Sequence, residues 1–214
     1  MSLLWNYVAS TINFIIPVCL WYFIGNLTYF LCNDDFKIAR NITSALHALS
    51  VVFFYQFNFS VFPVFYISRG YYVIDSMYEM ASLKSASSLK LYQLGMLVHH
   101  VATILVLYYL IDPLLTNYIY YTYFLAEVSN LPMYIMRHFN SINITNKYVI
   151  MLLLVSEFIA YSILRMTMCL PIIYEAYFDH YVPNLFRVLM AIMYTISGFW
   201  TYKLFTQIYN KIKN

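Results

Sequence analysis

The chain has 214 residues, of which 63% are hydrophobic and only 10% are charged. Soluble domains carry about a quarter charged residues, so the 12 basic and 9 acidic side chains here are too few to cover a water-facing surface. The net charge of +3, without any cluster of basic residues, argues against a nucleic-acid-binding protein. The composition therefore predicts an integral membrane protein.

Seven segments of the chain are apolar and long enough to cross a bilayer, for which a helix needs roughly 20 residues. Polar breaks separate them, such as CNDDFKIARN after the first segment and Asp112-Pro113 after the fourth. The predicted fold class is all-α: a polytopic membrane bundle of about seven helices around a central cavity that lipid can enter. The predicted helices cover residues 6–31, 43–59, 62–82, 91–111, 114–136, 148–170 and 185–208.

The boundary between the second and third helices is the weakest, because only residues 59–63 separate them and Arg69 lies inside the third. The charges favour keeping the two helices separate, since a merged helix would scatter the cations over both sides of the membrane. With seven helices the cations gather on one side, as in the positive-inside pattern, which predicts a lumenal N-terminus and a cytosolic C-terminus. The lumenal side receives Asp112, Glu175 and Asp179, with Arg187 near the start of the last helix. The cytosolic side receives Lys37, Arg40, Lys84, Lys90, Arg137, Lys147, Lys203, Lys211 and Lys213.

Several ionisable side chains lie well inside the predicted helices, where burial is costly and such groups often mark function. Counted inward from the cytosolic helix ends, they come to depths of about 10–15 Å. A single group of this kind is as often an interhelical hydrogen bond that holds the bundle together. For His47, Asp75 and Glu157 taken singly, both interpretations stay open. The full set is His47, Asp75, His99, His100, Glu127 and Glu157.

The adjacent histidines His99 and His100 are the strongest candidates for catalysis. Neighbouring helical residues point about 100° apart, so one imidazole can face a cavity while the other contacts a neighbouring helix. We expect the pair to face Glu127, because an imidazole beside a carboxylate is a natural general base or an oriented nucleophile. A metal held by the pair and Glu127 is the weaker alternative, and the three cysteines show no ligand spacing. We therefore expect no metal.

Two arginines lie toward the lumenal ends of predicted helices. Arg165 precedes Pro171 in the sixth helix, and Arg69 lies near the same face of the membrane. Long arginine side chains at such positions extend to the membrane interface. We therefore expect neither arginine to belong to the site.

Four stretches, in order and with the right spacing, resemble the TLC domain, the membrane fold shared by ceramide synthases, translocating-chain-associated membrane proteins and their relatives. The most specific of them contains a His-His-x-x-Thr motif. The stretches are ARNITSALHALS (39–50), with Arg40, Ser44 and His47; GYYVIDSMYEM (70–80), with Gly70, Tyr71, Tyr72 and Asp75; LVHHVATILVLYYL (97–110), with His99, His100 and Thr103; and AEVSNLPMYIMRHF (126–139), with Glu127, Ser129 and Pro132.

The resemblance implies a TLC-type transmembrane bundle over residues 33–211, with a first transmembrane helix at 1–32 and a short cytosolic tail at 212–214. In ceramide synthases two aspartates follow the His-His motif and are thought to complete the active site. The corresponding positions here hold Glu127 and Asn130. The E-x-S-x-x-P pattern of Glu127, Ser129 and Pro132 instead resembles the TLC-domain-containing relatives, and the chain is more similar to these than to true ceramide synthases.

The first hypothesis that follows is acyl transfer from coenzyme A to a lipid amine or hydroxyl. Acyl-CoA would be a co-substrate and not a bound cofactor, and Lys84 and Lys90 could attract its phosphates. The catalytic residues would be His99, His100, Glu127 and Asp75. The residues expected to line the cavity or bind lipid are His47, Ser44, Tyr72, Thr103, Ser129, Asn130 and Glu157.

The second hypothesis is a non-catalytic protein that binds, senses or transports lipid, or that escorts membrane proteins. Asn130, in place of an aspartate, favours it. A pore or ion transporter has less support, because the sequence has no broken-helix repeats or filter-like segments. In either of the first two cases the expected partners are membrane lipids, with no nucleic acid and with a homodimer left open. The resemblance implies the endoplasmic reticulum or another intracellular membrane.

Overall fold

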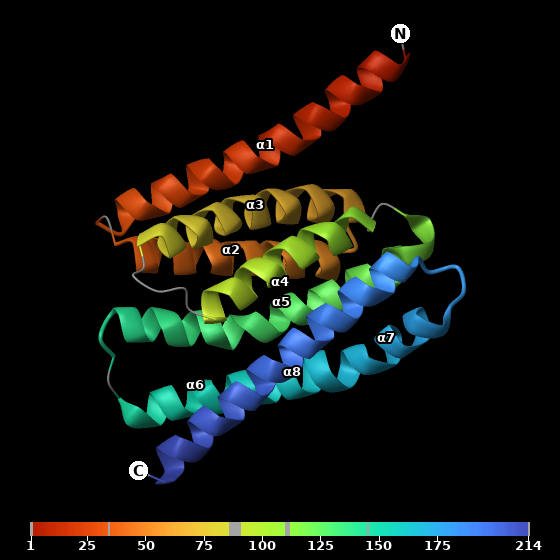
Figure 1. Ribbon diagram of the computed structural model, residues 1–214. Coiled ribbons are helices and arrows are strands. Elements are labelled where there is room, and N and C mark those ends of the chain that lie inside the picture. Colours follow the sequence, from red (N-terminus) through yellow and green to blue (C-terminus); the bar gives the residue numbers. More distant parts are fainter. Residues whose placement is uncertain (1, 34, 86–90, 110–111, 145, 214) are drawn as a thin grey trace.

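The computed structural model describes residues 2–33, 35–85, 91–109, 112–144 and 146–213 (Figure 1). Within these residues the chain is helical and contains no strand. The fold is a bundle of seven helices, because α6, η2 and α7 follow one another without a break and form one long helix. The elements are α1 (Ser2–Leu31), α2 (Phe36–Gln56), α3 (Val61–Ser85), α4 (Leu91–Tyr108), α5 (Pro113–Ser141), α6 (Lys147–Ala160), the π-helix η2 (Tyr161–Met168), α7 (Cys169–Phe178) and α8 (Asn184–Lys213).

The all-helical prediction is confirmed, including the break between the second and third helices. That break is built by Asn58, whose positive φ of 53° lets the amide of Phe59 return to the carbonyl of Phe54 after α2 ends. Asparagine takes the same left-handed conformation at Asn143, after α5. The sixth predicted helix extends beyond residue 170 to Phe178, and α8 runs through residues 212 and 213 of the expected tail.

Short polar caps start the next helices. The carboxylate of Asp35 accepts from the amides of Lys37 and Ile38 at the start of α2. Asp112 accepts from the amide of Leu114 ahead of α5, where Pro113 occupies the first helical turn and has no N–H that needs an acceptor. These caps satisfy amides that have no partner inside the helix, so the chain reverses direction within a few residues.

The central helices are α2, α3, α4 and α5, with α1 along one edge and the long α6–η2–α7 helix along the other (Figure 1). Helix α3 packs on α1 and α4, α2 packs on α5, and α8 crosses both α4 and α6. Helix α1 comes very near α3 at Gly70, where an added Cβ would lie 2.6 Å from the carbonyl carbon of Pro17. A glycine is therefore required there for the two helices to touch.

The bundle is apolar on its outside, and its apolar core encloses a set of buried polar and charged side chains. Large side chains such as Ile16, Phe30 and Leu152 are exposed, whereas His47 and Glu127 are almost completely buried. Among the described residues, three helices are long and apolar enough to cross a membrane by length and composition: Thr11–Leu31, Lys147–Phe178 and Asn184–Lys213. This arrangement is compatible with a membrane protein.

Candidate functional site

An arginine shared by two carboxylates joins α2 to α3. Nε of Arg40 lies 2.7 Å from Oδ1 of Asp75, and Nη2 of Arg40 lies 2.7 Å from Oε2 of Glu79. The two carboxylates project from one face of α3 because they are four residues apart, and both are buried. We call Arg40, Asp75 and Glu79 the Arg40 cluster. The sequence analysis did not single out Glu79, although its i, i+4 spacing from Asp75 was the available signal.

The second oxygen of Asp75 faces a histidine on α4. Nε2 of His100 lies 3.3 Å from Oδ2 of Asp75, and His100 is 2% exposed. A carboxylate at this position favours the tautomer that carries its proton on Nε2, which leaves Nδ1 as the basic nitrogen. Nδ1 of His100 has no hydrogen-bond partner among the described residues. The dyad His100–Asp75 therefore has the arrangement of an oriented general base.

Glu127 was expected to orient the histidine pair, and here the structure differs. Oε1 of Glu127 accepts from the hydroxyl of Tyr72 at 2.7 Å, and Oε2 accepts from Nδ2 of Asn130 at 3.4 Å. The imidazole nearest to it is His47, whose Nδ1 lies 3.9 Å from Oε2. The physical reason is packing: α5 lies against α2, whereas α4 lies against α3, so the histidine of α4 meets the carboxylate of α3.

Tyr72 lies between the two buried carboxylates. Its hydroxyl donates to Glu127, and its ring centroid is 5.5 Å from that of His100. Contacts thus continue from the Arg40 cluster through His100 and Tyr72 to Glu127; all are polar except the ring contact between His100 and Tyr72. Four of the residues expected at the site, namely Asp75, His100, Tyr72 and Glu127, are brought together in this way.

His47 sits in an aromatic enclosure. Its ring stacks on Tyr71 with centroids 4.0 Å apart and an interplanar angle of 8°, and it meets the edge of Trp21 at 5.6 Å. Nε2 of His47 lies 3.1 Å from the hydroxyl of Ser68 and 3.3 Å from that of Tyr123. A completely buried imidazole with two hydroxyl partners and stacked rings supports the interpretation of His47 as a residue of the packed core.

The expectation for Arg165 was wrong. The guanidinium does not extend to the outside of the bundle; it is buried and points at α5, where Nε donates to Ser129 and Nη2 donates to the carbonyl of Ala126 and to Oδ1 of Asn130. Oδ1 of Asn130 also accepts from the hydroxyl of Tyr161 at 2.8 Å. Ser129 and Asn130, both expected to line the cavity, are therefore held by Arg165.

The π-helix explains why Arg165 points inward. Two side chains in or directly after η2 bond back five residues: the hydroxyl of Thr167 donates to the carbonyl of Ser162, and the thiol of Cys169, the first residue of α7, donates to that of Leu164. The wider turn shifts the register of every later side chain relative to an α-helix. Depth counting along a regular helix could not reveal this shift.

His99 is next to His100 on α4, with ring centroids 5.8 Å apart, and is close to an apolar groove that it does not line. The groove has a volume of about 700 Å³ between α4, α7 and α8, and Gly95 and Val98 line it. Gly95 is one helical turn before His99, so both are on one face of α4. Nδ1 of His99 is buried and has no partner among the described residues. Thr103 donates to the carbonyl of His99 at 2.8 Å and to the sulfur of Met193 on α8 at 3.6 Å.

The remaining predicted residues are further apart. Ser44 accepts from the hydroxyl of Tyr71 at 2.8 Å and donates to the carbonyl of Arg40, which ties it to the core. Glu157 is buried on α6, and its Oε2 has no partner among the described residues. The side chain of Lys84 and the whole of Lys90 lie outside the described residues. Within the described part of the chain, no group of three or more His, Cys, Asp or Glu side chains could hold a metal ion.

Comparison with known protein families, with curated proteins and with solved structures found no match.

Proposed function

We propose that this chain is a TLC-type membrane protein that crosses the bilayer seven times and transfers an acyl group from coenzyme A to a lipid amine or hydroxyl. The single observation that carries the proposal is the buried dyad His100–Asp75, next to His99 on the helix that borders an apolar groove. The N-terminus would be lumenal and the C-terminus cytosolic. The endoplasmic reticulum, or another intracellular membrane, is the expected location.

The distribution of polar residues supports seven crossings. In the described part of the chain, three helices are long and apolar enough to span a membrane by length and composition. The central helices α2 and α3 carry charged residues, and Arg40, Asp75 and Glu79 pair with one another inside the bundle. Ionisable groups that pair within a bundle are tolerated in a bilayer, because they are not presented to lipid.

The groove between α4, α7 and α8 supports a long-chain substrate. Its wall on α8 extends over residues 187–199, with Arg187 at one end, which corresponds to about 18 Å of helix. One leaflet of the hydrocarbon core is about 15 Å thick, so the groove matches the length of an acyl chain. An acyl chain in it would bring the thioester close to His99.

The chemistry proposed for His100 is general base catalysis. Nδ1 of His100 takes the proton of the attacking lipid amine or hydroxyl while that group adds to the thioester carbonyl. The carbon–sulfur bond then breaks, and the imidazolium returns the proton to the departing coenzyme A thiolate. Asp75 stabilises the imidazolium between these two steps, and His99 positions the acyl group.

The test is acyl transfer by the purified protein with a panel of acyl-CoAs, sphingoid bases and lysolipids. Turnover is expected from the natural chain and is expected to disappear when both His99 and His100 are replaced by alanine. His180→Ala serves as the matched control, because His180 is exposed in the turn between α7 and α8. Equal turnover by the double variant and by the control would refute the catalytic role.

A second candidate, a non-catalytic lipid-binding protein, is favoured by Asn130. Both Arg165 and Tyr161 donate to its carbonyl oxygen, so this side chain is engaged in packing where ceramide synthases have an aspartate. Lipid that co-purifies with folded protein, but never turns over with acyl-CoA, would support this candidate over the first.

The proposed topology is tested by cysteine labelling in sealed microsomes. Cys32 ends α1 and would be cytosolic, whereas a cysteine introduced by His180→Cys would be lumenal. A membrane-impermeant maleimide is expected to label Cys32 in intact vesicles and residue 180 only after permeabilisation. Labelling of both in intact vesicles would exclude the odd number of crossings between them.

A further inference from the structure

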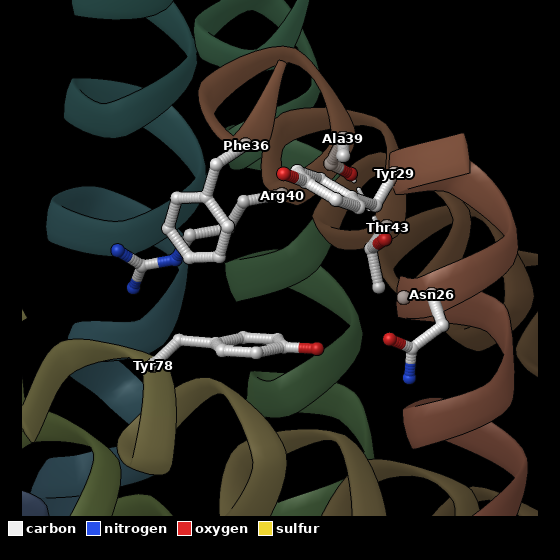
Figure 2. A pocket seen from close by; sticks show the side chains of 8 residues that line it. Asn26, Tyr29, Phe36, Ala39, Arg40, Thr43 and Tyr78 are labelled. Carbon is white, nitrogen blue, oxygen red and sulfur yellow. Dashed lines mark hydrogen bonds between the residues drawn. The ribbon is translucent and has the colours of Figure 1, made fainter. Parts of the chain in front are cut away.

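A small pocket lies where the C-terminal end of α1, the start of α2 and the C-terminal half of α3 meet. Its volume is about 190 Å³. Figure 2 shows the rings of Tyr29, Phe36 and Tyr78 around one space, with Asn26 on a further side. The rings of Phe36 and Tyr78 meet edge to face, with centroids 5.4 Å apart. Three aromatic rings from three different helices thus line the same pocket.

The groups around the pocket favour a cation. Arg40 lines the pocket, and its side chain keeps 26% of its exposure, but its Nε and Nη2 are engaged by Asp75 and Glu79. Two carboxylates thus face one guanidinium, and the Arg40 cluster attracts a positive charge rather than a phosphate. The faces of aromatic rings also attract cations, and quaternary ammonium groups are the ligands that aromatic cages recognise. The lining therefore fits a quaternary ammonium group.

The position of the pocket along α1 fits the headgroup layer. Helix α1 has 30 residues, which is about 45 Å, the thickness of a bilayer including its headgroups. Gly25 and Tyr29 lie six and two residues before its end at Leu31, or about 3–9 Å from it. The headgroup region on each side is about 5–7 Å thick. The pocket is thus at the depth of phospholipid headgroups on the side predicted to be cytosolic.

We propose that this pocket binds the phosphocholine headgroup of a phospholipid in the cytosolic leaflet. The quaternary ammonium lies among the three rings, and the phosphate remains in the headgroup layer outside them. A volume of 190 Å³ is below the range of about 300–1,000 Å³ for whole drug-sized ligands, so the acyl chains remain outside in the bilayer. The proposal rests on the membrane embedding proposed above and is independent of acyl transfer.

Gly25 provides a specific way to disturb the pocket. A Cβ at this position would lie 2.7 Å from the hydroxyl oxygen of Tyr78 but 3.7 Å from the ring carbon that bears it. Gly25→Ala is therefore expected to push the Tyr78 ring away, whereas removal of the hydroxyl by Tyr78→Phe leaves room for the added methyl group. The double variant keeps three rings around the pocket.

The experiment is native mass spectrometry of the full chain in detergent, with phosphatidylcholine, phosphatidylethanolamine and phosphatidylglycerol of identical acyl chains. The natural chain is expected to retain phosphatidylcholine on the order of tenfold more strongly than the other two lipids. Gly25→Ala is expected to lose this preference, and Gly25→Ala/Tyr78→Phe to regain it. Phe23→Leu, an exposed ring on the same helix, is the control and is expected to keep the preference.

Equal retention of the three lipids by the natural chain would overturn the proposal, as would stronger retention of phosphatidylethanolamine or phosphatidylglycerol. A Gly25→Ala variant that keeps the preference would also overturn it, and so would a double variant that folds but does not regain it. The variant with alanine at both His99 and His100 is expected to retain phosphatidylcholine like the natural chain. Loss of acyl transfer and loss of headgroup binding are therefore separate results.

Discussion

Asp75 contacts His100 with one carboxylate oxygen and Arg40 with the other, at 3.3 Å and 2.7 Å. The arginine holds the carboxylate in place on the side opposite the imidazole. The orientation of His100 therefore depends on a residue of α2, on a residue of α3 and on the packing of α4 against α3.

Asp75→Asn is expected to lower acyl transfer by roughly 10²–10⁴-fold. The asparagine oxygen can still accept from Arg40, but its amide nitrogen would then donate toward Nε2 of His100 and favour the wrong tautomer. The measurement is turnover per folded protein. Glu79→Gln replaces the other carboxylate that pairs with the same arginine by a neutral amide. It is expected to change turnover only a few-fold. Equal losses in both variants would mean that the charge of the cluster matters and the tautomer does not.

Arg165→Met is expected to lower the free energy of unfolding by roughly 3 kcal/mol. The substitution keeps much of the side-chain volume but leaves Ser129, the Ala126 carbonyl and Asn130 without their donor. The measurement is reversible unfolding in mixed detergent. Arg69→Met is the control, because the guanidinium of Arg69 lies over the ring of Phe14 and is only partly buried. Unchanged stability of the Arg165 variant would mean that water replaces the guanidinium.

Gly70→Ala is expected to destabilise the bundle by about 1–3 kcal/mol. The methyl group would meet the backbone and ring of Pro17 at 2.6–2.8 Å, so α1 must move away from α3. Thermal unfolding of purified protein is the measurement. Gly95→Ala is the matched control, because a Cβ there meets nothing within 4 Å, and the gain in helix propensity is worth about 0.5–1 kcal/mol. A Gly70→Ala variant more stable than the Gly95→Ala variant would show that α1 packs differently against α3.

Gly95→Leu is expected to fill the groove between α4 and α8 next to His99. If an acyl chain occupies the groove during transfer, the turnover of the variant with short acyl-CoAs stays as before, whereas its turnover with long ones falls on the order of tenfold. The measurement is the ratio of turnover with sixteen-carbon acyl-CoA to turnover with eight-carbon acyl-CoA. An unchanged ratio would place the acyl chain elsewhere, without bearing on the role of His100.

The helices were predictable because each is a run of apolar residues bounded by a polar turn. The boundary near Asn58 followed from the distribution of charges, even though the hydropathy there is weak. The buried position of Asp75, His100 and Glu127 was also predictable, since an ionisable residue inside an apolar helix must face the interior.

Which carboxylate meets which histidine was not predictable. The answer depends on the rotation of α3 relative to α4 and of α5 relative to α2, and residue spacing within one helix does not determine either. Arg165 was misplaced for a related reason, because its direction depends on π-helical turns that leave no clear mark in the sequence. Glu79 was missed although its spacing from Asp75 predicts a common face.

The π-helix over Tyr161–Met168 also has a consequence for how the chain tolerates changes in its length. A π-helical turn holds one residue more than an α-helical turn. This segment therefore contains more residues per turn than the regular α-helix before and after it. Deleting one residue after Arg165 could be absorbed by tightening the coil there, and the guanidinium would keep its place. Deleting one residue from α6, before the π-helix begins, would rotate Arg165 by about 100° about the helix axis and turn it away from α5.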